Sequence, residues 1–217
     1  MNFIITALLS YVVGCLSPAF YIVRMKTGID IRKHDTGNAG ATNAGRLLGR
    51  KFYVLIAVID VLKGVAAVLL GMLLAGNGAD ITLPFGIVTD AQSANIALAM
   101  VCVVAGHIFP AQMKFHGGQG VAATGGAILV VNPPTMLFFV AFYYLCAKTT
   151  RNKELAGLAS IIVIPLAFLV FMNIFPFRAN LVTFIASVLA TALMLWVQFF
   201  RKEPRNMKNE TVKIPVD

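Results

Sequence analysis

Residues 30–51 read DIRKHDTGNAGATNAGRLLGRK, a polar stretch in a chain that is otherwise mostly apolar. Glycines at positions 37, 40 and 45 alternate with Thr and Asn side chains, and Arg46 follows. Glycine lets the backbone approach a ligand closely, and successive N–H groups in such turns form a concave anion site. Arginine adds a planar fork that suits phosphate. We therefore interpret this stretch as a loop that holds a phosphorylated substrate.

The composition around this loop is that of a membrane protein. Of 217 residues, 59% are apolar and only 12% are charged, and the mean hydropathy is +0.82. Soluble domains carry about 25% charged residues. At about 20 residues per spanning helix, the chain predicts an all-α fold, a polytopic bundle of about seven transmembrane helices with polar cytoplasmic loops. We expect one transmembrane domain, residues 1–200, and a polar, basic cytoplasmic tail, residues 201–217.

The apolar runs cover residues 3–23, 52–76, 94–113, 120–132, 135–147, 155–173 and 180–200. The fourth and fifth runs are short and are divided by the sequence NPP, so we interpret them as a helical pair with a tight turn; one long broken helix is the alternative. Pro18 predicts a kink that frees a carbonyl group in the first run. Asp60 and Lys63 are i,i+3 neighbours in the second run. This pair is either part of a functional site or a structural ion pair that ties helices together.

The distribution of basic residues predicts the topology. All Lys and Arg residues except Lys63 and Arg178 fall in segments 24–51, 113–119 and 148–154 or in the tail. Seven spans place these segments on one side, and cytoplasmic loops collect Lys and Arg. We expect a multi-pass protein of the cell (plasma) membrane, with the N-terminus outside and the C-terminus and active site in the cytoplasm. The net charge of +9 then follows from membrane topology and does not indicate nucleic acid. The expected partner is a lipid bilayer.

Two further polar stretches share the predicted cytoplasmic face. The motif HGGQGVA at 116–122 opens a helix, where free N–H groups and the helix dipole form an anion site; a flexible turn is the alternative. It lacks the Gly-Lys-Ser/Thr ending of nucleotide-binding phosphate loops. A third stretch includes Thr150, Arg151 and Ser160; its alternative is a topological anchor with a small-residue helix contact. We expect the loops 30–51, 114–120 and 148–160 to converge.

The sequence contains no evident Ser–His–Asp arrangement and no metal-ligand spacing, so neither a metal nor another cofactor is predicted. His34, His107 and His116 are isolated in the sequence, and we interpret each as a hydrogen-bonded structural residue. A positively charged, glycine-lined pocket without a protein nucleophile favours direct transfer between two bound substrates. Such a reaction is driven by positioning and electrostatics.

These motifs resemble those of the bacterial integral-membrane acyl-phosphate:glycerol-3-phosphate acyltransferases. Residues 30–46 are similar to that family's first motif, Asp-Ile-Arg-Lys-x-Gly-Ser-Gly-Asn-x-Gly-Ala-Thr-Asn followed by Arg. Residues 106–122 are similar to its second, Gly-His-x-Phe-Pro…Phe-x-Gly-Gly-Lys-Gly-Val-Ala. The resemblance covers residues 10–165 and extends to the Asp60-x-x-Lys63-Gly64 pattern and to a third polar stretch around Thr150 and Ser160.

The resemblance implies a seven-helix membrane enzyme that moves a fatty acyl group from acyl phosphate to glycerol 3-phosphate, forming lysophosphatidic acid for phospholipid synthesis. Its substrates are then the expected partners, together with the enzyme that supplies acyl phosphate. The implied catalytic residues are Thr36, Asn38 and Arg46. The implied substrate-binding residues are Gly37, Gly40, Asn43, Lys114, Gly117, Gly118, Gly120 and Ser160.

The chain departs from the family pattern at several polar positions, and these departures keep other interpretations open. A serine, a glycine and a lysine of the family motifs are replaced, and the changes at phosphate contacts weaken binding if they remove charge. The alternatives are a catalytically degenerate paralogue that binds phosphorylated lipids or metabolites and a small transporter, for which broken helices are typical. The departing positions are Asp35, Thr36, His116, Gln119, Gly157, Phe200 and Pro204.

Overall fold

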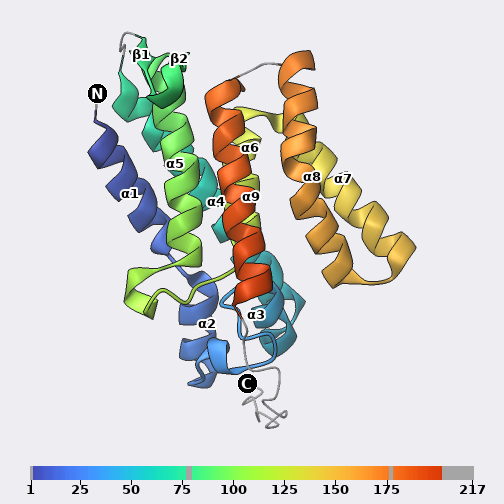
Figure 1. The fold of residues 1–217 in the computed structure, drawn as a ribbon. Coiled ribbons are helices and arrows are strands. Elements are labelled where there is room, and N and C mark those ends of the chain that lie inside the picture. Colours follow the sequence, from blue (N-terminus) through green and yellow to red (C-terminus); the bar gives the residue numbers. More distant parts are fainter. Residues whose placement is uncertain (1, 77–79, 176–177, 202–217) are drawn as a thin grey trace.

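The computed structural model describes residues 2–76, 80–175 and 178–201, and these form a helical bundle (Figure 1). In chain order its helices are α1 (Phe3–Cys15), α2 (Pro18–Thr27), η1 (Ile31–Lys33), α3 (Ala41–Leu48), α4 (Arg50–Ala75), η2 (Pro84–Gly86), α5 (Ala91–Ile108), η3 (Ala111–Met113), α6 (Val121–Val131), α7 (Pro133–Thr150), α8 (Lys153–Ile174) and α9 (Leu181–Phe200). Two short strands, β1 (Ile81–Thr82) and β2 (Val88–Thr89), pair antiparallel.

The predicted all-α membrane bundle is confirmed. Each predicted apolar run coincides with a helix, and the first run coincides with the pair α1 and α2. The short runs around the NPP sequence form two helices, α6 and α7, and the Asn132 side chain accepts a hydrogen bond from the Thr135 N–H at the start of α7. Within the described residues, five segments are long and apolar enough to cross a membrane: Phe3–Thr27, Arg50–Ala75, Ala91–Met113, Leu155–Ile174 and Leu181–Phe200.

Two short strands lie between α4 and α5. Strands β1 and β2 form a small hairpin, with Ile81 opposite Thr89 and Thr82 opposite Val88. Phe85 and Gly86 turn the chain between them with positive φ angles, a backbone conformation that hydropathy patterns do not reveal. Asp90 then caps α5 by accepting a hydrogen bond of 2.8 Å from the Ser93 N–H.

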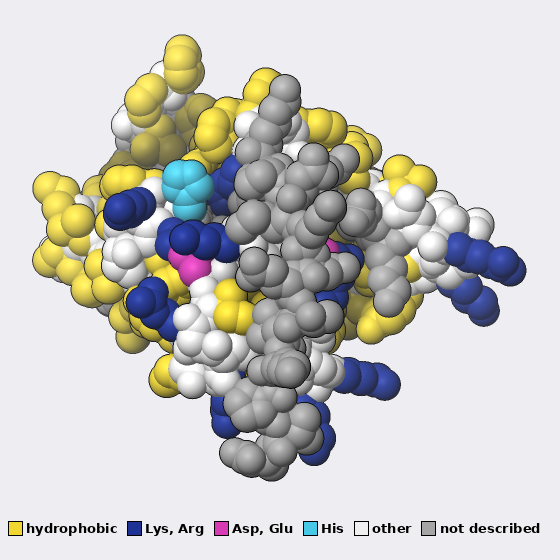
Figure 2. Space-filling view, turned by 90° about the horizontal axis from the view of Figure 1, so that it is seen from below, with side chains coloured by type: hydrophobic (Ala, Val, Ile, Leu, Met, Phe, Trp, Pro, Cys, Tyr) yellow, Lys and Arg dark blue, Asp and Glu magenta, His cyan; other side chains and the backbone are white. Residues whose placement is uncertain are grey.

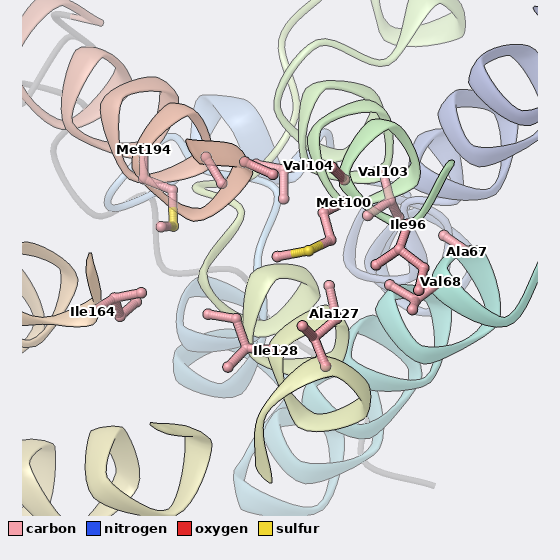
Figure 3. Close-up of a cluster of buried hydrophobic side chains, with 14 of the residues drawn as sticks. Ala67, Val68, Ile96, Met100, Val103, Val104, Ala127, Ile128, Ile164 and Met194 are labelled. Carbon is pink, nitrogen blue, oxygen red and sulfur yellow. The ribbon is translucent and has the colours of Figure 1, made fainter. Parts of the chain in front are cut away.

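The main hydrophobic core lies between α4, α5, α6, α8 and α9 (Figure 3). Aliphatic and methionine side chains fill it, and small residues let the helices approach closely. At Gly126 of α6, an added Cβ would collide with the carbonyl group of Val61 in α4, as is typical of membrane helix pairs. The labelled core residues are Ala67, Val68, Ile96, Met100, Val103, Val104, Ala127, Ile128, Ile164 and Met194.

The two ends of the helical bundle differ. The N-terminus, the β1–β2 hairpin and the α6–α7 turn lie at one end, at the top of Figure 1. Helices α2 and α3, the segment 109–120 and the end of α9 lie at the other. Figure 2 shows that basic side chains gather over this second end, which we call the basic end. The loop 30–51 and the segment 109–120 therefore lie at the same end of the bundle.

Candidate functional site at the basic end

Asn43 fixes the shape of the first polar loop. Its side chain is 1% exposed, and its Nδ2 group donates to the carbonyl oxygens of Ile31 (3.1 Å), His34 (2.9 Å) and Asn38 (3.0 Å). The amide nitrogen is thus fully used inside the protein. Asn43 therefore positions the loop that carries the other candidates. Its Oδ1 atom is buried and has no hydrogen-bond partner among the described atoms, so its role as a substrate-binding residue stays a prediction.

Thr36, Asn38 and Gly40 are half-buried in this loop, and Gly37 is buried. The Gly37 N–H donates to the His34 carbonyl (2.9 Å) and the Gly40 N–H to the Asn38 carbonyl (3.0 Å), which closes two turns. Thr36 Oγ1 accepts from the Asn38 N–H at 3.5 Å. The Asn38 Oδ1 atom is buried and has no hydrogen-bond partner among the described atoms. Since unpaired buried oxygens are costly, Asn38 offers an acceptor to a ligand hydroxyl group.

Arg32 joins the first loop to segment 109–120. Its guanidinium forms a forked ion pair with Asp30, at 2.6 Å between Nη2 and Oδ2, and its Nη1 donates to the Met113 carbonyl at 2.7 Å. These hydrogen bonds lower the pKa of Asp30 below its usual value, because the guanidinium stabilises the ionised carboxylate. A second link is the Ala39 N–H, which points to the Gly117 carbonyl at 3.5 Å. The two glycine-containing loops are therefore side by side.

The second loop packs on His107. The N–H groups of Gly117 and Gly118 donate to the carbonyl oxygens of Ile108 (3.0 Å) and His107 (3.1 Å). An added Cβ at Gly118 would collide with His107 Nε2, so this position admits only glycine without rearrangement. The sequence interpretation expected these two N–H groups to bind phosphate. The structure corrects this: both are used within the protein, because the loop folds back on the end of α5.

Gly120 begins α6 with φ of 89° and is its N-terminal cap. The first N–H groups of a helix lack intrahelical partners, so the anion-binding capacity of this motif shifts from Gly117 and Gly118 to the start of α6. Gln119, which stands where the family has lysine, donates from Nε2 to Gln198 Oε1 of α9 at 2.9 Å. Lys114 and His116 are exposed beside it, with His116 Nδ1 2.7 Å from the Lys114 carbonyl oxygen.

A buried charged cluster lies behind the loops. Asp60 Oδ1 is 2.9 Å from Lys63 Nζ and 3.4 Å from His107 Nδ1. Lys63 Nζ also donates to the carbonyl oxygens of Gly14 (3.1 Å) and Leu16 (2.7 Å), where the helix is interrupted between α1 and α2. These contacts favour the structural interpretation of the Asp60–Lys63 pair, since Lys63 satisfies backbone groups that the break leaves free.

Arg46 extends from α3 at the rim of the site. Its Nη1 atom pairs with Asp35 Oδ2, and the two side chains are 47% and 34% exposed. Asp35 has φ of 48°, a left-handed conformation that glycine, the family residue at this position, adopts readily. Arg46, the residue predicted to bind phosphate, is thus in direct contact with Asp35, which differs from the family pattern.

The third predicted element does not join the other two. Ser160 is fully buried in α8 and its hydroxyl donates to the Ala156 carbonyl at 2.7 Å. Helix α8 packs against α7 and α9, and Figure 1 shows the α7–α8 turn set apart from α3 and segment 109–120. The predicted convergence of three loops is therefore wrong in its third member. A shared membrane face does not bring loops together unless their helices are neighbours.

Arg201 is a contributor that the sequence analysis missed. Its guanidinium donates to the carbonyl oxygens of Gly117 (3.0 Å) and Ile108 (2.9 Å), so the end of α9 holds the second glycine loop. In sequence it is one basic residue at the edge of a basic tail, and its spacing does not indicate a contact with residues 108 and 117. Phe200 is exposed and stacks on Trp196, whereas Pro204 and the predicted tail from residue 202 lie outside the described residues.

A hollow lies beside this loop, with an aromatic lining and a polar edge. Its lining residues are Phe109, Phe115, His116, Trp196, Phe200 and Arg201. Arg201 connects the hollow to the second loop, because it lines the hollow and also donates to the Gly117 carbonyl. Among the described residues, no group of three or more His, Cys, Asp and Glu side chains is placed to hold a metal ion.

Comparison with known proteins agrees with this arrangement. A model of the family described as glycerol-3-phosphate acyltransferase matches residues 4–209. A curated glycerol-3-phosphate acyltransferase of Thermoanaerobacter sp. (strain X514) is 35% identical over 173 residues, which cover 80% of this chain and 79% of the relative. One of Clostridioides difficile (strain 630) is 38% identical over 160 residues, 74% of each chain.

The fold is also similar to a solved structure. This is the crystal structure of PlsY (YgiH), an integral membrane glycerol 3-phosphate acyltransferase, in its glycerol 3-phosphate form. The TM-score is 0.74 at 26% sequence identity, and the match covers 90% of this chain and 88% of the other. The family match over nearly the whole chain, with the fold and the motifs at the basic end, shows that this protein belongs to the glycerol-3-phosphate acyltransferase family.

Proposed function

We propose that this protein transfers an acyl group from acyl phosphate to glycerol 3-phosphate at the basic end of the bundle. The observation that carries the proposal is the family match over residues 4–209, which includes both glycine-containing loops. The contact between these loops, through Arg32 and Ala39, supports a single site built from both loops. The function of the relatives thus agrees with the chemistry that the loops can perform.

In the proposed reaction, a hydroxyl oxygen of glycerol 3-phosphate forms a bond to the carbonyl carbon of acyl phosphate. The bond between that carbon and the phosphate oxygen breaks. The departing phosphate takes the hydroxyl proton, so the products are lysophosphatidic acid and inorganic phosphate. This route needs no protein nucleophile, and the residues act by positioning and charge stabilisation.

Arg46 and Asn38 have distinct roles in this proposal. Arg46 binds the phosphate group of glycerol 3-phosphate, since guanidinium and phosphate match in shape and charge. The unpartnered Asn38 Oδ1 accepts a hydrogen bond from the glycerol hydroxyl group, and Thr36 lies next to it on the same turn. The start of α6 and Lys114 supply positive potential for the second phosphate.

The aromatic hollow is the proposed place of the acyl donor. An acyl phosphate has an apolar chain and an anionic head, and the hollow offers Phe109, Trp196 and Phe200 beside Arg201. Arg201 also lies 5.7 Å from the centre of the Phe109 ring. Because the lining comes from the ends of α5 and α9, a chain in the hollow can continue into the bilayer.

We also propose that the basic end faces the cytoplasm and the N-terminus lies outside. The distribution of Lys and Arg supports this orientation, and water-soluble glycerol 3-phosphate and the enzyme that supplies acyl phosphate are then on the correct side. The alternative of a catalytically degenerate paralogue has one specific support, the occupation of Arg46 by Asp35.

Complementation distinguishes these two functions. We expect the chain to restore growth of a bacterial strain that lacks its own glycerol-3-phosphate acyltransferase, and the variant Arg46→Ala to fail while it inserts in the membrane at the same level. If neither protein restores growth, although both are present in the membrane at equal levels, the result would favour the degenerate paralogue.

A further inference from the structure

The pairing of Asp35 with Arg46 has a consequence for substrate binding. The two side chains form an ion pair at the rim of the site and keep 34% and 47% of their surfaces exposed. Both are reachable by a soluble anion from the basic end. The guanidinium that would bind phosphate is therefore already in contact with a carboxylate of the same chain.

The fold holds these residues opposite each other before any ligand arrives. Asn43 lies three residues before Arg46 on α3, so both side chains leave the same face of that helix. The Asn43 amide binds the His34 carbonyl at 2.9 Å, directly before Asp35. A turn closed by the Gly37 N–H and the His34 carbonyl then keeps Asp35 in its left-handed conformation, with φ of 48°. The ion pair is thus a preformed element of the loop.

We propose that Asp35 is an internal competitor that occupies Arg46 until a phosphate group displaces it, and so weakens the binding of glycerol 3-phosphate. This rests on the proposed function in taking glycerol 3-phosphate as the displacing anion. The carboxylate imitates one edge of a phosphate group, since both accept hydrogen bonds from the guanidinium fork. Asp35 therefore raises the substrate concentration at which the site fills.

The exposure of the pair limits the size of this effect. Exposed ion pairs contribute between nothing and about 1 kcal/mol, which corresponds to at most about a fivefold change in affinity. The Asp35 carboxylate therefore weakens substrate binding but does not prevent it. An active enzyme with a high Michaelis constant (KM) for glycerol 3-phosphate is the expected result.

The test compares four full-length proteins in phospholipid vesicles: wild type, Asp35→Asn, Arg46→Ala and the double variant. Asparagine keeps the left-handed backbone accessible and removes only the charge. Inorganic phosphate and glycerol 3-phosphate are the probes, with dissociation constants from calorimetry and KM from turnover. Asp80→Asn is the matched control, because it removes an exposed negative charge beside the hairpin at the opposite end.

We expect Asp35→Asn to bind both probes about two- to fivefold more tightly than wild type, and Asp80→Asn to bind them as wild type does. In the Arg46→Ala background, Asp35→Asn should change nothing, because the competitor has lost its partner. Equally tighter binding with and without Arg46 would overturn the proposal, because it would indicate general charge repulsion by Asp35. The proposal would also be overturned if Asp35→Asn bound the probes no more tightly than wild type, or did not bind phosphate at all. Absence of turnover in every protein contradicts the proposed function, while the binding comparison still decides the role of Asp35.

Discussion

Lys63 Nζ lies 3.1 Å from the carbonyl oxygen of Gly14, the oxygen that would accept a helical hydrogen bond if residue 18 were not proline. The same amino group binds the Leu16 carbonyl and the Asp60 carboxylate. The break between α1 and α2 is thus satisfied from α4, and it turns α2 towards the basic end, where the first loop begins. A costly buried charge serves here to position the site.

Replacing Lys63 tests this role. Lys63→Met leaves Asp60 as a buried charge and frees two carbonyl groups, and such losses cost about 3–5 kcal/mol. We expect a large fall in the melting temperature of the detergent-solubilised protein. Lys26→Met, which removes an exposed lysine of α2, is the control and should melt like wild type. Similar melting of both variants would contradict a structural role for Lys63.

Asn43→Ala should disorder the first loop without unfolding the bundle. The variant leaves three loop carbonyls without their shared donor, and a lost buried hydrogen bond costs about 1–3 kcal/mol. We expect faster amide hydrogen exchange in residues 31–40 and a large loss of transferase activity. The control is Asn173→Ala, since Asn173 is exposed and binds only its own helix among the described contacts. Unchanged exchange in the loop would show that Asn43 does not hold it.

Gly118→Ala should disturb the second loop more than its small size suggests. The added methyl group meets His107 Nε2, so the loop must move away from α5. We expect at least about a tenfold loss in kcat/KM, which corresponds to about 1.4 kcal/mol. At Gly157 an added Cβ meets nothing within 4 Å, and Gly157→Ala should keep wild-type activity. Equal activity of the two variants would contradict the tight packing on His107.

The Asp30–Arg32 pair should make stability depend on pH. Arg32 lowers the pKa of Asp30 below 3.8 in the folded protein, so the pair stabilises the fold above the unfolded pKa and loses this contribution as pH falls through the lowered folded value. We expect wild type to melt higher than Asp30→Asn above about pH 5, and the difference to shrink below about pH 4. A difference in melting temperature that stays constant down to the acid limit would contradict this assignment.

Hydropathy and proline positions predicted the helices well, because a membrane span needs a long apolar run whatever its neighbours are. Charge distribution likewise predicted that the loops 30–51 and 114–120 share one end. The finer contacts depend on tertiary distances that spacing does not encode. Asn43 resembles a ligand-binding residue in sequence, and only the folded loop shows three carbonyl groups around it. Arg201 reaches Gly117 across 84 positions, and Ser160 is separated from the site by helix packing.

Transfer by the purified protein tests the central claim most directly. The wild type in phospholipid vesicles receives palmitoyl phosphate and radiolabelled glycerol 3-phosphate, and lysophosphatidic acid and inorganic phosphate are measured together. We predict equal amounts of both products, loss of both in Arg46→Ala, and no product when palmitoyl-coenzyme A replaces palmitoyl phosphate. Release of phosphate without lysophosphatidic acid, or no product from a wild type that binds glycerol 3-phosphate, would contradict the account.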